Sequence, residues 1–86
     1  MVIWKYELEM TDQQSIIVPG GASFLSVANQ RGKLCLWALI FDLSQPRVSR
    51  QIEIVGTGNP MSSGRRVFIG TVIVEPFVWH VFEFIG

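Results

Sequence analysis

Residues 33–42 read KLCLWALIFD, and this stretch decides the fold class. In an extended strand, alternate side chains point to opposite faces of the sheet. Here both faces are apolar: one carries Leu34, Leu36, Ala38 and Ile40, and the other carries Cys35, Trp37, Leu39 and Phe41. An antiparallel strand of this kind needs a cover on each side, from its own domain or from a partner chain. We therefore expect Lys33–Asp42 to be a central strand, with Trp37 among the most buried side chains.

The segments on both sides of this stretch alternate in the same way and are broken by glycine, proline and polar turns. In the first of them, residues 4–10, the apolar side chains of Trp4, Tyr6, Leu8 and Met10 alternate with charged ones, which predicts one buried and one solvent-facing side. Further strands are expected at residues 15–18, 22–29, 50–55, 67–74 and 77–84, with a tight turn at Gln30-Arg31-Gly32 and loops at 43–49 and 56–66. No window repeats apolar residues at helical spacing. The chain is therefore predicted to be a single all-β domain, residues 1–86: a small antiparallel β-sandwich or barrel of about seven strands with no long helix.

The composition excludes several classes of protein. The 86 residues are 49% hydrophobic and 16% charged, which is too apolar for a disordered chain. Seven basic residues balance seven acidic ones, so no net positive charge draws the protein to nucleic acid or to anionic lipid. The single cysteine, Cys35, rules out an internal disulfide and a multi-cysteine metal site, and no cofactor is expected. We find neither a signal peptide nor an apolar run long enough to span a membrane, and we expect the protein in the cytoplasm.

The longest loop carries the clearest candidate binding residues. Gly56-Thr57-Gly58-Asn59 begins like a dinucleotide-binding fingerprint but lacks its third glycine, and no helix follows. Glycine-rich backbone can still present N–H groups to an anion, and arginine side chains bind phosphate through two donors. Four of the arginines fall close to this loop in the sequence: Arg47, Arg50, Arg65 and Arg66. The sequence therefore predicts an anion-binding or partner-binding site here, and the alternative is an ordinary loop with solvated arginines.

His80 is the only histidine, and strand alternation places it on the opposite face from Glu83. The two side chains therefore cannot form a local acid–base or metal-binding pair. We interpret His80 as a structural residue, with a role in binding as the alternative. We expect Glu83 to lie in water near a frayed end, and the alternative is a buried carboxylate that has a cationic or hydrogen-bonding partner or is protonated. No arrangement of nucleophile, base and orienting group can be built from the residues present, so the protein is not expected to be an enzyme.

Five blocks of the sequence resemble one family. They are Ile3–Leu8 (IWKYEL), Leu25-Ser26-Val27, Leu34–Leu39 (LCLWAL), Val55–Gly58 (VGTG) and Trp79–Glu83 (WHVFE), in this order and at similar spacing. The chain resembles a family of small proteins of unknown function that are encoded mainly by bacteriophages and prophages. The resemblance implies a viral protein that acts inside a bacterial host. It transfers no catalytic residue, and Asn59 stands where relatives tend to have histidine.

The sequence and the resemblance together favour a non-enzymatic binding module. The first hypothesis is an anti-defence or host-takeover inhibitor that docks on a host bacterial protein. The alternative is an oligomeric sponge that sequesters a small anionic immune signal such as a cyclic nucleotide. A third hypothesis is a structural or assembly protein of the phage.

The apolar residues also predict self-association. A chain of this length buries only about 60% of its unfolded surface, and five remaining strands cannot cover both faces of the two most apolar ones. We expect a homo-oligomer in which the last strand or the outer face of Lys33–Asp42 meets its symmetry mate. The competing expectation is a monomer whose surplus apolar patch is reserved for a host protein.

Overall fold

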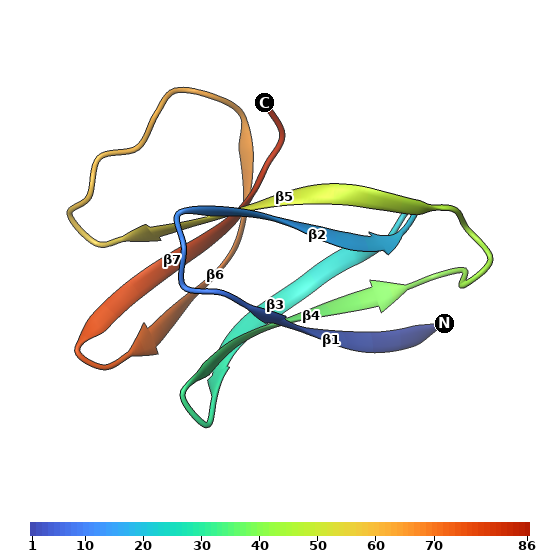
Figure 1. The fold of residues 1–86 in the computed structure, drawn as a ribbon, viewed down its shortest axis with the longest axis horizontal. Coiled ribbons are helices and arrows are strands. Elements are labelled where there is room, and N and C mark those ends of the chain that lie inside the picture. Colours follow the sequence, from blue (N-terminus) through green and yellow to red (C-terminus); the bar gives the residue numbers. More distant parts are fainter.

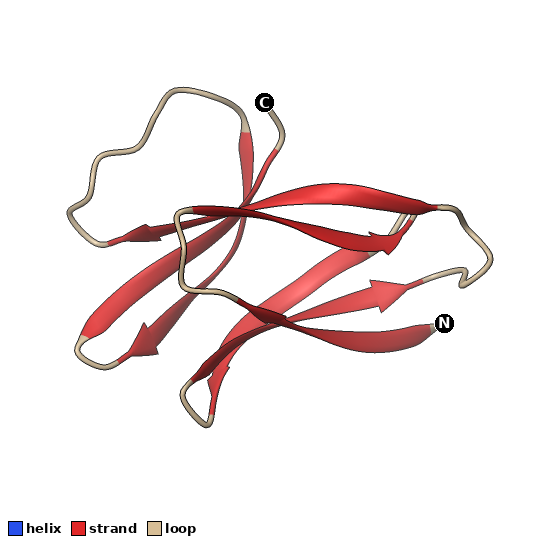
Figure 2. Ribbon diagram, in the orientation of Figure 1, coloured by secondary structure: helices blue, strands red, loops and turns tan.

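The chain folds into two antiparallel β-sheets packed face to face (Figures 1 and 2). A computed structural model describes residues 1–86 and contains seven strands and no helix. The strands are β1 (Val2–Leu8), β2 (Gln13–Pro19), β3 (Ser23–Gln30), β4 (Lys33–Ile40), β5 (Arg47–Gly56), β6 (Arg66–Val74) and β7 (Phe77–Phe84). The three-stranded sheet has the order β1-β4-β3 and the four-stranded sheet the order β2-β5-β7-β6. The all-β prediction is confirmed as a sandwich that does not close into a barrel. The structure holds no helix of the length and apolarity that crossing a membrane would need.

The core lies between the sheets and is built from alternate residues of each strand. β4 supplies one full face of it: Leu34, Leu36, Ala38 and Ile40. The four-stranded sheet contributes the facing side chains, which are Ile16, Val18, Ile52, Ile54, Val72 and Val81. Each of the leucine, isoleucine and valine side chains among these gains roughly 1.5–3 kcal/mol from burial, and together they hold the two sheets against each other.

β4 is the central strand of its sheet, as the sequence predicts, but its second face is not covered. Trp37 and Leu39 are only half-buried, so the prediction that Trp37 is among the most buried residues is wrong. The reason is architectural. A sandwich has two layers, and each sheet keeps one face that no element of the chain covers. Only Cys35 on this face is fully buried, at 2% exposure.

One side of the sandwich is sealed by a close approach of β3 and β6, the edge strands of the two sheets. A Cβ atom added at Gly70 would lie 2.9 Å from Cγ2 of Val27. Asn29 Nδ2 also donates a hydrogen bond of 3.1 Å to the carbonyl oxygen of Ile73. On the other side, β1 and β2 remain as free edges.

Two of the connections between strands, β3–β4 and β4–β5, follow from local chemistry. Arg31 and Gly32 both have positive φ, 55° and 82°, which makes the predicted β3–β4 turn a type I′ hairpin. The predicted loop at 43–49 is too long, since β5 already begins at Arg47. The carboxylate of Asp42 accepts bonds from the backbone N–H (2.9 Å) and hydroxyl (2.6 Å) of Ser44, so the turn is complete within a few residues.

Candidate functional site

The loop singled out by the sequence is a crossover between two parallel strands. β5 and β6 lie on either side of β7, so residues 57–65 must cross from one side of β7 to the other (Figure 1). We call residues 57–65 the crossover segment. It occupies the outer face of the four-stranded sheet, where it packs close to Phe84: a Cβ atom added at Gly64 would lie 2.7 Å from the Phe84 ring.

Arg66 fastens the crossover segment to the sheet. Its Nε and Nη2 donate to the two carboxylate oxygens of Glu53, at 2.6 and 3.2 Å. Its Nη1 donates to the carbonyl oxygens of Ser62 (3.0 Å) and Gly64 (3.4 Å). Glu53 points outward, as its place in the alternation predicts, but only 6% of it is exposed because the arginine and the segment cover it. The alternative of an ordinary loop with solvated arginines therefore does not describe Arg66, whose charge is already neutralised by Glu53.

Arg50 is engaged on the inner side of the same sheet. Its Nε and Nη2 donate to Glu83 at 2.5 and 2.7 Å, and its Nη1 donates to the carbonyl oxygen of Ala22 at 2.6 Å. The guanidinium also lies 4.2 Å from the ring centroid of Phe24. Glu83 thus belongs to an ion pair between neighbouring strands of the four-stranded sheet, and the Arg50 of this pair contacts Phe24 of the other sheet. The expectation that Glu83 frays into water is wrong. The cause is that Glu83 shares the inward-facing alternation of Val81.

The other two candidate arginines lie apart from this pair and from each other. Arg47 donates to the carbonyl oxygens of Leu43 (3.1 Å) and Gln45 (3.3 Å), and its guanidinium lies 5.7 Å from the Trp4 ring centroid. It therefore braces the β4–β5 turn. The side chain of Arg65 is exposed and forms no hydrogen bond or ion pair within the chain. The structure does not gather the four arginines into one cluster.

The glycine-rich turn and His80 are connected. Asn59 closes the turn by donating its backbone N–H to the carbonyl oxygen of Gly56 at 3.0 Å, and Gly58 has a φ of 88°. Thr57 Oγ1 lies 2.7 Å from Nε2 of His80, and Thr71 Oγ1 lies 3.0 Å from its Nδ1. Both ring nitrogens of His80 therefore have partners within the chain, and the ring ties the start of the crossover segment to β6.

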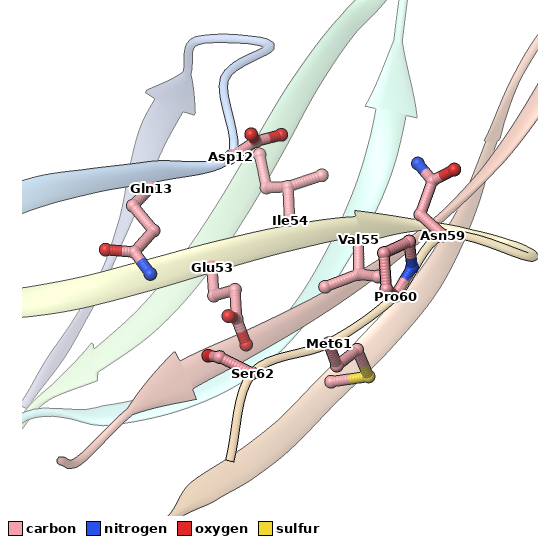
Figure 3. A pocket seen from close by; sticks show the side chains of 9 residues that line it. All are labelled: Asp12, Gln13, Glu53, Ile54, Val55, Asn59, Pro60, Met61 and Ser62. Atoms are coloured by element: carbon pink, nitrogen blue, oxygen red, sulfur yellow. The ribbon is translucent and has the colours of Figure 1, made fainter. Parts of the chain in front are cut away.

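A pocket of about 370 Å³ opens beside the crossover segment (Figure 3). It is lined by Asp12, Gln13, Glu53, Ile54, Val55, Asn59, Pro60, Met61 and Ser62. The charged side chains among them are the carboxylates of Asp12 and Glu53 (Figure 3). The Glu53 carboxylate is already bonded to Arg66. Of the predicted residues only Asn59 lines this pocket. Its chemistry is polar and acidic, which does not suit an anion.

Sequence reasoning missed a basic pocket on the other sheet. A shallow depression of about 510 Å³ on the outer face of the three-stranded sheet is lined by Lys5, Glu7, Gln30, Arg31, Lys33 and Cys35. Lys5 Nζ donates to Gln30 Oε1 at 2.7 Å, and Lys33 lies 3.6 Å from the Glu7 carboxylate. Three cations thus face one carboxylate. The alternation of Lys5 and Glu7 was visible in the sequence, but the pairing that brings them beside Arg31 was not.

An apolar patch adjoins this basic pocket on the same face. It consists of Ile3, Trp37 and Leu39, and we call it the Trp37 patch. Ile3 lies opposite Leu39 in the β1–β4 register, and Lys5 lies opposite Trp37, so the patch and the pocket are continuous. Ile3 is 59% exposed, and Trp37 and Leu39 are half-buried. No element of the chain packs over them.

The remaining reactive side chains stand apart from one another. No three of the histidine, cysteine, aspartate and glutamate side chains lie together as metal ligands would. The thiol of Cys35 is buried, and it lies in a different sheet from His80.

Comparison with known proteins gives one match. A family model described as a domain of unknown function (DUF7352) matches residues 1–85. No curated protein and no solved structure is significantly similar to the chain.

Proposed function

This chain belongs to the DUF7352 family of domains of unknown function, and from that premise we propose that it is a non-enzymatic module that docks on a protein. The docking surface is the outer face of the three-stranded sheet, with Trp37 at its centre. The single observation that carries this proposal is that the Trp37 patch has no cover within the chain.

The residues of the patch have the properties of an interface core. Tryptophan is enriched among the few side chains that supply most of the binding energy at protein interfaces, because one ring buries a large apolar area. Ile3 and Leu39 extend the apolar area on two neighbouring strands. A rigid sheet also presents these side chains without the entropy cost of ordering a loop.

The charges beside the patch define the chemistry of the partner. Lys5, Arg31 and Lys33 exceed Glu7 by two positive charges, although the whole chain is neutral. A partner with an apolar contact area flanked by acidic side chains complements this arrangement, and complementary charge accelerates association. Arg31 adds to the argument, since it occupies a left-handed turn position where glycine or asparagine costs less.

The site chemistry gives no support to an enzyme. The Cys35 thiol is covered, and both nitrogens of His80 are hydrogen-bonded to threonine hydroxyls. A nucleophile needs a base within hydrogen-bond reach, and these two residues stand in different sheets.

The phage resemblance of the sequence blocks supplies the setting. We infer that the partner is a host bacterial protein in the cytoplasm, and that occupying its surface inhibits it as a counter-defence or takeover factor. A second candidate rests on the basic pocket alone: three cations around one depression also suit a small anionic signal such as a cyclic nucleotide.

A binding experiment with matched surface variants tests the proposal. The tagged protein captures its partner from bacterial lysate, and the affinity of the purified partner is then measured by calorimetry. Trp37→Ser and Ile3→Ser are expected to weaken binding about 30-fold, the factor that corresponds to 2 kcal/mol at a central residue. Phe77→Ser is the control, because Phe77 is about as exposed as Ile3 (57% and 59%) but lies on the other sheet.

Two outcomes would refute docking through this face. One is equal affinity of the Trp37→Ser, Ile3→Ser and control variants. The other is a combined result. Every lysate protein is captured equally by wild type and by the three variants, and added cyclic nucleotides raise the melting temperature of the protein. That rise, if lost in Arg31→Ala, would establish the anion-capture candidate instead.

A further inference from the structure

β1 is an edge strand whose outer side is unprotected. It pairs only with β4, and no other strand lies along its second edge (Figure 1). None of the backbone hydrogen bonds outside the strand ladders involves Ile3, Lys5 or Glu7. Natural proteins commonly cover, bend or interrupt such an edge, because its free N–H and C=O groups accept another strand.

The hairpin geometry shows which backbone groups point outward. In a two-residue hairpin the closing pair, here Gln30 and Lys33, exchanges both hydrogen bonds. Lys33 therefore bonds toward β3, and Leu34, the next residue of β4, bonds toward β1. Leu34 lies opposite Leu8, so the even-numbered residues of β1 bond to β4. The odd-numbered residues Ile3, Lys5 and Glu7 direct their N–H and C=O groups away from the sheet.

Glu9, the first residue after β1, is consistent with this direction. It has the same parity, and its N–H and C=O groups are satisfied by the amide side chain of Gln14, at 3.1 and 2.8 Å. The side chain of Gln14 thus closes the edge at Glu9. No side chain or backbone group of the chain bonds to the outward N–H and C=O groups of Ile3, Lys5 and Glu7.

We propose that this edge pairs with the same edge of a second copy, in an antiparallel two-fold register centred on Tyr6. In this register Lys5 lies opposite the partner's Glu7 and exchanges both backbone bonds with it. The symmetry generates the same pair a second time.

Charge selects this register among the alternatives. A register centred on Lys5 places two lysines opposite each other, and one centred on Glu7 places two glutamates opposite each other. A register centred on Trp4 sets Ile3 against the partner's Lys5 and forms no pair of opposite charges. Within β1, which ends at Leu8, only the register centred on Tyr6 gives two opposite-charge pairs, which stabilise antiparallel neighbours, and it matches the outward backbone groups of Lys5 and Glu7. The register centred on Glu7 could pair Lys5 only with Glu9, whose backbone groups are already bonded to the Gln14 side chain.

The existing contacts of these side chains permit the exchange. Lys5 is bonded to a neutral amide, and the Lys33–Glu7 pair is solvent-exposed, with 66% and 58% of the side chains accessible. Side chains exposed to this degree lose little by changing partner. The product is a continuous six-stranded sheet with both Trp37 patches on one face, so the dimer would present the proposed docking surface twice. The last strand cannot form such an edge contact, since β7 lies between β5 and β6.

Sedimentation equilibrium over about 1–500 µM protein tests the proposal through charge reversal. The contact is a single pair of strands, at the small end of specific interfaces, so we expect wild-type dimer with a dissociation constant on the order of 10 µM. Lys5→Glu and Glu7→Lys each place like charges opposite in both pairs and are expected to weaken the dimer at least 10-fold. The double variant Lys5→Glu with Glu7→Lys restores the opposite-charge pairs and is expected to dimerise within about threefold of wild type.

The controls distinguish pairing at this edge from a general effect of surface charge or of unfolding. Glu75→Lys makes the same charge change as Glu7→Lys, but at the β6–β7 turn, and should leave the dimer intact. Trp37→Ser should also leave the dimer intact. Circular dichroism verifies that each variant folds, and Lys5→Gln and Glu7→Gln replace a charge-reversed variant that does not. A monomer at 500 µM overturns the proposal, and so does failure of the charge swap to restore what the single variants lose.

Discussion

The guanidinium of Arg66 and the carboxylate of Glu53 form a two-point ion pair on the outer face of the four-stranded sheet. Only 13% and 7% of the two side chains are accessible to solvent. The ring of Phe84 lies beneath the guanidinium, 5.1 Å from its central carbon, and shields the pair further. The two residues therefore couple the crossover segment to β5 across a region that water hardly enters.

Removing Arg66 is expected to destabilise the fold strongly. Arg66→Ala leaves the Glu53 carboxylate buried without a counter-charge, and breaking such a pair costs about 3 kcal/mol or more. Arg65→Ala, one residue away, removes an exposed side chain without a partner and should change the free energy of unfolding by less than about 0.5 kcal/mol. Urea denaturation of the two single variants measures the contrast.

A second substitution shows whether the stranded charge is the cause. Glu53→Gln in the Arg66→Ala background removes that charge, and we expect it to recover part of the lost stability. Equal destabilisation by Arg65→Ala and Arg66→Ala would contradict the assignment of Arg66 as the anchor of the crossover segment.

The contrast between these arginines also shows what the sequence can predict. Strand alternation placed the strands, the hairpin at Arg31 and the central position of β4, because those features depend on local pattern. The pairing of Arg66 with Glu53 depends on how a loop crosses β7, and no local pattern records that path. The four arginines are close in the sequence, yet the topology sends Arg50 inward and Arg66 outward.

The burial of Trp37 was overestimated for a related reason. A strand that is apolar on both faces predicts two covers, but the sequence does not say whether the second cover belongs to the chain. Which residues share an outer face depends on the long-range order of the strands. The sequence alone therefore does not place the Trp37 patch and the basic pocket on one surface.

Tyr6 carries a buried hydroxyl that has no hydrogen-bond partner. Its desolvation opposes folding, so Tyr6→Phe is expected to raise the free energy of unfolding by about 1 kcal/mol. Burial also raises the pKa of Tyr6, although the charge of Arg47 partly offsets it. The folded state therefore prefers the protonated hydroxyl to the ionised one. The stability that depends on this protonation is fully present below the unfolded pKa of about 10 and is lost as the pH rises through the raised pKa. Denaturation of both proteins at neutral and alkaline pH checks the two effects, and a loss of stability in Tyr6→Phe would contradict the first.

Asp42 is expected to make the fold sensitive to acid. Hydrogen bonds from the side chain and then the backbone of Ser44 lower the pKa of Asp42. The folded state favours the carboxylate, so its stabilising effect is present above the unfolded pKa near about 4 and is lost as the pH falls through the lowered pKa. Asp42→Asn should therefore be less stable than wild type at neutral pH, and the difference in the free energy of unfolding should shrink as the pH falls through the lowered pKa of Asp42. Ser44→Ala, which removes the first cause, should narrow the same difference, and a gap that stays constant with pH would refute the linkage.

The last prediction concerns the seam between β3 and β6. Gly70 permits a close approach, since an added Cβ atom would meet Cγ2 of Val27 at 2.9 Å and its backbone nitrogen at 3.7 Å. Gly70→Ala is expected to destabilise the fold by about 1–3 kcal/mol, because the added methyl group overpacks the contact between β3 and β6. The two strands belong to different sheets, so no ladder of hydrogen bonds holds them together against this strain. Val27→Ala removes the atom in the way but also leaves a small gap of its own. If the clash is the cause, the double variant should be more stable than the sum of the two single effects predicts, by at least about 1 kcal/mol in a double-mutant cycle. If the changes in the free energy of unfolding are strictly additive, Gly70 and Val27 are not energetically coupled. The effect of Gly70→Ala would then arise from the backbone at the bulge between Phe68 and Gly70.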